Sequence, residues 1–453
     1  MISRSKNGMH SGTLAGWILC GLQVSALGLA AFEQRLNGVT PHAYGTVGLW
    51  SAGLLLAAAL LLRVFLAGSS KKARCCFLGG LMLITGLPAL YALNASHEWR
   101  AGVGLFPLTH CHLLPASAFP EGTIRGLWLS VALAASLGAA ASLPSGARRL
   151  LTVLIVSAAA GMALLALHQR MVPRPYPVYE WTGLFVSQNH FAAFAYLVFP
   201  VALTRGARVQ YRAFQGGRFS DPSGFCYLAA GLLAGAVIVT GSRAGMAVMV
   251  LQAIGFILIQ WRIRRRYPFA MQPFSRIHRM ILGSLLVLAL VSGSIGLARN
   301  LQLVRAVGHD LSFRGTVAGD TLAMWRSRQW WGTGPGTFSV VFPYYQTLPV
   351  DQFFFKHAHC EPLQFLAEFG ILGGGITLAG FVLIGRSSRR YDRRSTHVPS
   401  FMELEGYGLL LALGGVGLHS LVDFPFRHPL ILMMTCVWIG LLAGVERRRA
   451  ETR

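Results

Sequence analysis

The sequence predicts an all-α polytopic integral membrane protein with about twelve transmembrane helices and a partly helical external loop subdomain. Of its 453 residues, 54% are hydrophobic and only 12% are charged, whereas soluble domains contain about 25% charged residues. Apolar runs of roughly 18 residues or more recur along the whole chain, and each can cross a hydrocarbon core of about 30 Å. A lipid bilayer is therefore the expected environment of most of the chain.

The apolar runs define the predicted spans. They are 13–32, 46–67, 75–93, 124–143, 150–167, 187–204, 223–241, 244–262, 280–297, 363–385, 405–424 and 428–445. The first run also resembles the apolar part of a signal peptide. We interpret it as a membrane anchor, because its removal would leave an odd number of spans.

The basic residues predict how the chain is oriented. The formal net charge is +24, and most Lys and Arg residues fall in short segments that share one side when the spans alternate. These segments are the N-terminus (Arg4, Lys6), 71–74, 148–149, 205–218, 262–279, 386–394 and 447–453. Because cytoplasmic loops of membrane proteins are rich in Lys and Arg, the pattern predicts cytoplasmic N- and C-termini. It also explains the charge without any nucleic-acid partner.

Three substantial external loops remain, at 94–123, 168–186 and 298–362. Within the longest, the segment RGTVAGDTLAMWRSRQWW at 314–331 has apolar residues at helical spacing. The stretch GTGPGTF that follows ends this helix, because Gly and Pro favour turns. We therefore predict a single integral-membrane domain over 1–453 that contains a folded, partly helical loop at 298–362.

Polar residues beside the predicted spans are candidates for function, because charge near the bilayer costs free energy. Arg243 lies in TGSRAG, a very short external connection, and Arg314 lies in LSFRG. A guanidinium group makes bidentate contacts with phosphate. Each arginine alone also fits a simpler role, as a snorkelling side chain or an exposed loop residue.

Two further clusters flank spans on the same side. Asn189 in SQNHFAAF opens a span and also fits the role of a helix N-cap. His419 and Asp423 in HSLVDFPF are four residues apart and share a face of a helix. A carboxylate can orient a histidine and fix its tautomer, although the pair also fits the end of a helix.

The stretch HAHCEPLQFLAEFG at 357–370 contains the densest set of ionisable groups. His357 and His359 precede a helix start, where Glu361 is favoured by the helix dipole. Glu368 lies further into the span, so a pairing partner is expected.

Together these motifs resemble the O-antigen ligase and polymerase family of bacterial membrane glycosyltransferases. TGSRAG, FRGTVAGDTLAMWRSRQWWGTGPGTF, HAHCEPLQFLAEFGILGG and HSLVDFPF follow that family's order, and the resemblance covers roughly 180–430. The ligase signature matches at His359, Gly370 and Gly373, while Cys360 stands where the family has Asn, Ser or Gln. A thiol is the weaker hydrogen bonder.

The resemblance implies transfer of a glycan from an undecaprenyl-pyrophosphate carrier to a hydroxyl acceptor, without a metal or another cofactor. The acceptor is lipid A-core for a ligase and another lipid-linked glycan for a polymerase. The implied location is the bacterial inner membrane, with the active site at the periplasmic face.

Carried over residue by residue, the resemblance makes Arg243 and Arg314 the diphosphate-binding residues and His359 the general base. His357, Asn189, Asp423 and His419 are assigned supporting roles in the same site.

Four alternatives stay open at this point. An O-antigen or exopolysaccharide polymerase shares the motifs of a ligase. THCH at 109–112 and HAHC at 357–360 offer His and Cys ligands for zinc, or Cys111 and Cys360 form a disulfide. A polysaccharide or lipid transporter also fits the number of spans.

Overall fold

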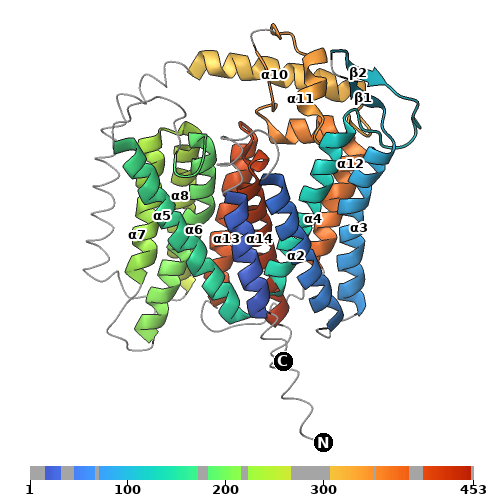
Figure 1. Cartoon of the computed structure of the whole chain (residues 1–453). Coiled ribbons are helices and arrows are strands. Elements are labelled where there is room, and N and C mark those ends of the chain that lie inside the picture. The colour runs from blue at the N-terminus through green and yellow to red at the C-terminus, as the bar shows by residue number, and fades with distance from the viewer. Residues whose placement is uncertain are drawn as a thin grey trace, which may run out of the picture.

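The computed structural model describes residues 16–31, 45–66, 71–100, 102–171, 182–215, 223–266, 307–350, 353–386 and 401–449. Most of its helices run side by side in one bundle, and a smaller layer covers one end of the bundle (Figure 1). The bundle contains a helix over Gly16–Ala31 together with α2 (Gly45–Leu66), α3 (Lys71–Leu93), α4 (Pro120–Ser142), α5 (Ser145–Met171), α6 (Gln188–Gln215), α7 (Ser223–Thr240), α8 (Arg243–Arg266), α12 (Glu361–Arg386), α13 (Phe401–Ser420) and α14 (Pro429–Arg449).

We call the layer at the end of the bundle the cap layer. It consists of the hairpin β1 (His97–Arg100) and β2 (Gly104–Pro107), the helices α10 (Val307–Ser327) and α11 (Phe338–Val341), and the 3-10 helix η1 (Phe342–Tyr344). A second 3-10 helix, η2 (Pro425–Arg427), joins α13 to α14. The antiparallel hairpin is an addition to the helical fold that the sequence did not predict.

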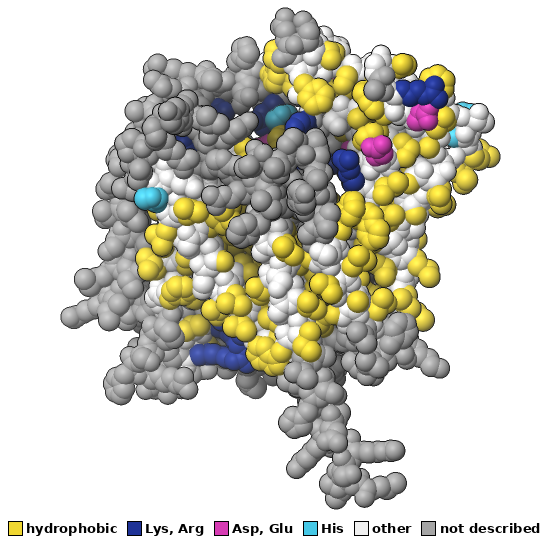
Figure 2. Space-filling view, in the orientation of Figure 1, with side chains coloured by type: hydrophobic (Ala, Val, Ile, Leu, Met, Phe, Trp, Pro, Cys, Tyr) yellow, Lys and Arg dark blue, Asp and Glu magenta, His cyan; other side chains and the backbone are white. Residues whose placement is uncertain are grey.

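The described helices make this a multi-pass membrane protein. Seven of them are long and apolar enough to cross a membrane: Cys75–Leu93, Pro120–Ser142, Ser145–Arg170, Gln188–Arg212, Ser223–Thr240, Arg243–Arg265 and Glu361–Leu383. Shorter apolar helices cover Gly16–Ala31, Trp50–Leu61 and Pro429–Ala443. The predicted span 280–297 lies outside the described residues, so a count of twelve is not confirmed. On the face shown in Figure 2, the described hydrophobic side chains cover the middle of the bundle and the charged side chains lie toward its ends.

The most enclosed helix of the bundle is α6, which packs against α7, α8 and α13. In its most apolar window, 94% of the residues are buried. A helix that is hydrophobic on all sides has to be surrounded by protein or lipid, and here other helices surround it. Its first residues, Gln188 and Asn189, are thereby held at the end of the bundle that faces the cap layer.

Small residues allow α4 to pack closely against α2 and α14. Its second half, from Ala132 onward, is almost entirely Ala, Ser, Gly and Leu, and these residues are buried. A Cβ atom on Gly440 of α14 would lie 2.2 Å from the carbonyl oxygen of Leu137, and one on Gly53 of α2 would lie 2.8 Å from the Cβ of Ala132. Small residues at such contacts let helix backbones approach, which drives helix association in membranes.

The cap layer has an aromatic core of its own. The rings of Phe338 and Phe342 stack with centroids 4.7 Å apart, and Phe355 meets Phe342 edge-on at 5.8 Å. Val317 and Met324 of α10 are fully buried against this cluster. The helix expected over 314–331 is therefore present, although it begins at Val307 and ends at Ser327. In the described part of the loop, these residues form a buried cluster.

The helix α12 is broken at Gly370, where the backbone adopts φ +65° and ψ −175°. A Cβ atom there would lie 2.3 Å from the carbonyl oxygen of Trp330, so only glycine fits both the conformation and the space. A Cβ atom on Gly373 would lie 2.5 Å from the hydroxyl of Tyr91. Both signature glycines thus permit close packing.

The break in α12 exposes backbone N–H groups that the turn after α10 satisfies. Ile371 donates its N–H to the carbonyl of Gln329 at 2.9 Å, and Leu372 donates to Trp330 at 3.0 Å. A broken helix at membrane depth needs such replacement partners, because lipid offers none. The turn after α10 is therefore attached directly to α12.

Candidate active site

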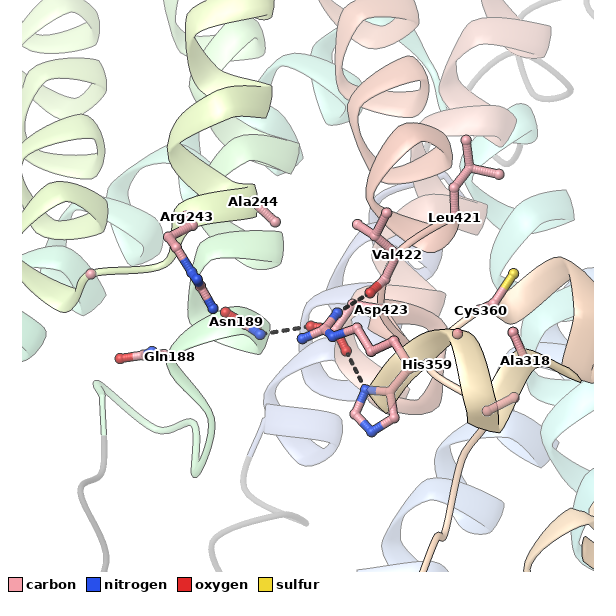
Figure 3. A pocket seen from close by; sticks show the side chains of 14 residues that line it. Gln188, Asn189, Arg243, Ala244, Ala318, His359, Cys360, Leu421, Val422 and Asp423 are labelled. Atoms are coloured by element: carbon pink, nitrogen blue, oxygen red, sulfur yellow. Dashed lines mark hydrogen bonds and ion pairs between the residues drawn. The ribbon is translucent and has the colours of Figure 1, made fainter. Parts of the chain in front are cut away.

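A cavity of about 550 Å³ lies where the cap layer meets the end of the bundle. Five residues that the sequence singled out line it together: Asn189, Arg243, Arg314, His359 and Asp423 (Figure 3). They come from five separate motifs, on α6, α8, α10 and the two loops before α12 and after α13. His357 and His419 do not line the cavity, although His419 contacts a residue that does.

The two arginines reach the cavity from different helices. Arg243 is the first residue of α8 and follows a tight turn in which Gly241 has φ +79°. Arg314 lies on α10 and donates a hydrogen bond from Nη1 to the carbonyl oxygen of Val422. Gly315 and Ala318 on the same helix are small, which leaves the cavity open beside the guanidinium group. Two cations and a helix N-terminus thus favour an anionic ligand here.

Asp423 is the hub of the polar contacts in the cavity. Its Oδ2 accepts a hydrogen bond of 2.6 Å from Nδ2 of Asn189, and its Oδ1 accepts one of 3.0 Å from the backbone N–H of Phe424. The ring nitrogens His359 Nδ1 and His419 Nε2 each lie 3.6 Å from one of its oxygens. The side chain is only 6% exposed. These contacts join α6, α13 and the loop before α12.

The contacts also keep Asp423 ionised. Burial alone would raise the pKa of its carboxyl, but contacts from His359 and His419 and the N–H of Phe424 hold that pKa well below its usual range. Behind it, the hydroxyl of Tyr196 lies 2.9 Å from Nδ1 of His419, so both nitrogens of this buried ring have a polar neighbour. The predicted His419–Asp423 pair is present, and the buried His419 contacts the side of Asp423 that faces the protein interior.

His359 adopts a backbone conformation that side chains rarely occupy. Its φ is +54°, the one positive φ at a non-glycine residue in the part of the chain that the structure describes. Such conformations cost free energy and concentrate at functional sites. The conformation turns the ring toward the cavity, with Nδ1 facing Asp423 and the side chain 28% exposed. A carboxylate beside Nδ1 favours the tautomer that carries the proton there, which leaves the lone pair on Nε2.

The neighbours of His359 are fixed by α12. The N–H of Ala358 donates to Oε1 of Gln364 at 3.0 Å, which ties the loop to the first turns of that helix. The ring of Phe424 meets the ring of His359 edge-on at 4.7 Å. Cys360 lines the cavity beside these residues, so the position where the chain departs from the ligase signature is part of the site.

An ion-pair network next to the cavity joins the partly exposed Arg427 to two buried acids. Arg427 of η2 contacts Oε2 of Glu361 at 3.3 Å through Nε and donates to Oε2 of Glu368 at 3.2 Å through Nη2. Glu368 also accepts hydrogen bonds from the N–H of Phe338 at 3.1 Å and from Gln364 at 3.4 Å. The expected partner of Glu368 is thus Arg427, and the network joins α12, η2 and the cap layer.

His357 occupies a different environment from His359. Its ring packs against Phe424 at 4.8 Å, away from the cavity. Burial, together with the charge of Arg427, lowers the pKa of His357 to about 3. Burial likewise lowers the pKa of His428 to about 3. Both rings are therefore neutral in the folded protein at physiological pH.

Acidification from about pH 7.5 to about pH 5 is expected to lower the thermal unfolding midpoint. In the unfolded chain these histidines have pKa values near 6.5, so below that pH the unfolded state binds protons that the folded state does not. The stabilisation is complete above about pH 6.5 and is lost as the pH falls toward the folded-state values. Scanning calorimetry in detergent over this range measures it, and His357→Gln should flatten the slope. A midpoint that does not change with pH contradicts the expectation.

The structure does not bring together the residues proposed for a zinc site or for a disulfide. Cys111 and Cys360 are both free thiols. His110 and His112 line a second cavity, separate from the one that contains His359. Among the described residues, no group of three or more His, Cys, Asp or Glu side chains could hold a metal ion.

Two residues of the site were missed from the sequence. Gln188 lines the cavity beside Asn189, and Arg427 forms the network beneath it. Arg427 directly follows the motif HSLVDFPF, and the two acids of HAHCEPLQFLAEFG need a cation. This need for a counter-ion is the sequence signal that points to Arg427, which lies next to the last span.

Comparison with known proteins adds one match. Residues 228–378 match a family model described as O-antigen ligase. The matched segment contains Arg243, Arg314, His359 and both signature glycines, whereas Asn189 and Asp423 lie outside it. No curated protein matches the chain.

Proposed function

Since residues 228–378 belong to the O-antigen ligase family and the chain is a multi-pass membrane protein, we propose that it transfers a glycan from an undecaprenyl-pyrophosphate carrier to a hydroxyl acceptor. The observation that carries this proposal is the single cavity in which Arg243, Arg314 and the pair His359–Asp423 meet. It combines an anion-binding side with a base.

The donor diphosphate binds at the two arginines. The guanidinium groups of Arg243 and Arg314 stabilise the negative charge that grows on the pyrophosphate as its bond to the sugar breaks. The first N–H groups of α8 add to this potential. Pyrophosphate is a stable anion, so it leaves without a general acid. In this proposal the arginines stabilise its charge without a metal.

The acceptor hydroxyl binds at His359. As its oxygen attacks the anomeric carbon, its proton moves to Nε2 of His359, and the new C–O bond forms while the bond to pyrophosphate breaks. Undecaprenyl pyrophosphate departs with the bonding electron pair. Asp423 stabilises the imidazolium that results and holds the ring in place, and Asn189 holds Asp423.

The membrane arrangement suits a lipid-linked donor. The cavity lies at the ends of α6, α8 and α13, where a polyprenyl chain can remain in the bilayer while its diphosphate reaches the arginines. In this proposal the cavity faces the periplasm of a bacterial inner membrane and both termini are cytoplasmic. The distribution of basic segments supports that orientation. The acceptor is lipid A-core, which makes the enzyme a ligase of lipopolysaccharide assembly.

Arg243→Gln and Arg314→Gln are each expected to lower the efficiency of transfer about tenfold to a hundredfold, because a charged hydrogen bond to the donor is lost. Transfer from an undecaprenyl-pyrophosphate glycan by the purified protein measures this. Arg100→Gln is the matched control, since Arg100 is exposed and pairs with Glu98 outside the cavity.

The same assay separates the two members of the family. Supplying lipid A-core supports ligase activity, whereas supplying only a second lipid-linked repeat supports polymerase activity. Full transfer by both arginine variants would remove the proposed donor site.

A further inference from the structure

A second cavity, of about 390 Å³, lies between the loop that follows β2 and the turn that follows α10. Many of the side chains that line it are basic or aromatic. The side chains that define it are His110, His112, Arg326, Arg328, Trp330 and Trp331. No Asp or Glu is among the residues that line it.

Positive groups converge on this cavity. The rings of His110 and His112 lie 4.4 Å apart. Burial lowers the pKa of the neighbouring His97, and the charges of Arg328 and His110 lower it further. The nearby carboxylate of Glu98 is paired with Arg100.

The polar and aromatic groups suit a sugar that carries an anionic substituent. Arg326 and Arg328 offer planar forks that bind phosphate or carboxylate groups. Trp330 is 56% exposed, so a large aromatic face is available to the apolar face of a sugar ring. An aromatic ring with a polar edge offers contact area at low entropic cost.

Close packing and backbone hydrogen bonds hold the wall of the second cavity. Gly332 has φ +70°, and a Cβ atom there would lie 2.5 Å from the backbone of Glu368. The carbonyls of Gln329 and Trp330 accept hydrogen bonds from α12, as described above. A site held in this way loses little entropy when it binds a ligand.

One helix connects the two cavities. Arg314 and Ala318 of α10 line the first cavity, and Arg326 and Ser327 of the same helix line the second. Ala318 and Arg326 are eight residues apart (326 − 318), which is about 12 Å along a helix. A saccharide of a few units spans this distance.

We propose that the second cavity binds an anionic sugar unit of the acceptor, remote from the hydroxyl that reacts. This inference rests on the proposed function and names the part of the substrate that lies outside the catalytic cavity. We assign the second cavity to the acceptor and not to the donor because of where the residues of the first cavity lie. Arg243 lies on one side of it, whereas His359, Cys360 and Ala318 lie toward the other side (Figure 3). A glycan whose hydroxyl is at His359 therefore extends along α10.

Binding of sugar phosphates to the purified full-length protein tests the site without any transfer. Calorimetry with glucose 6-phosphate, glucose and inorganic phosphate separates the anionic and sugar contributions. The wild type is expected to bind glucose 6-phosphate about tenfold or more tightly than either of the other two. Arg328→Gln and Trp330→Ala should each abolish that preference, and Arg264→Gln, which changes an exposed residue at the far end of α8, should retain it. Equal binding of the three probes, or a preference that survives both substitutions, overturns the proposal.

Kinetics identify the substrate that occupies the site. Arg328→Gln is expected to raise the KM for the lipid A-core acceptor about tenfold while kcat and the donor KM stay unchanged. A rise in the donor KM instead overturns the assignment to the acceptor. Arg243→Gln should lower transfer about tenfold to a hundredfold but keep the preference for glucose 6-phosphate over inorganic phosphate. Sugar phosphate binding by a protein that shows no transfer would therefore contradict the proposed function and leave the anionic sugar site in place.

Discussion

Replacing His359 with asparagine is expected to lower kcat for glycan transfer about a hundredfold to ten-thousandfold, the usual contribution of a general base. The imidazole is the group whose Nε2 takes the proton of the acceptor hydroxyl in the proposed reaction. Asparagine removes the base but tolerates the positive φ of this position better than most residues. The donor KM should change little, because Arg243 and Arg314 are untouched.

Two controls make the His359 experiment decisive. His168→Gln changes a histidine at the exposed end of α5 and should leave transfer unchanged. An unchanged thermal unfolding midpoint for His359→Asn excludes misfolding as the cause of any loss. If the variant retains full activity, His359 is not the base. A loss confined to the donor KM would instead assign it to donor binding.

Replacing Arg427 with methionine is expected to reduce the free energy of unfolding by about 3–5 kcal/mol, the usual cost of breaking a buried ion pair. The substitution leaves Glu361 and Glu368 without their shared cation, and these carboxylates are only 8% and 2% exposed. The cap layer and the loop before α12 both depend on Glu368 and Gln364. Thermal unfolding in detergent measures the loss.

The charge argument for Arg427 is tested by neutralising the whole network. In the triple variant Arg427→Met with Glu361→Gln and Glu368→Gln, the network holds no unpaired charge, so most of the lost stability should return. Arg100→Met is the matched control, because it breaks an exposed ion pair that contributes little. A triple variant as unstable as Arg427→Met alone would show that packing, not charge, causes the loss.

Much of the bundle follows from local sequence, because apolar runs and their flanking Gly, Pro and charges predict spans one at a time. The hairpin of β1 and β2 was missed, since strands of four residues carry too short a pattern. The break at Gly370 was not predicted either. Its cause is the close approach of Trp330, which is a tertiary contact.

The candidate site could be predicted as a set of residues but not as a geometry. The cavity unites Asn189 and Asp423, which are 234 positions apart, and no spacing rule relates such residues. His357 and His359 are two residues apart and both rings contact Phe424, but only His359 lines the cavity. Arg427 was not predicted because its partners, Glu361 and Glu368, lie on another helix, α12.

The break in α12 has a consequence for how the protein is made. The second half of this helix begins with N–H groups that are capped by carbonyls of Gln329 and Trp330. Those residues precede α12 in the chain, so they are synthesised first and are available when the span emerges. Until the turn after α10 docks, the helix that enters the bilayer carries unsatisfied donors. Completion of one membrane segment during biosynthesis is thereby coupled to the folding of a layer that lies outside it.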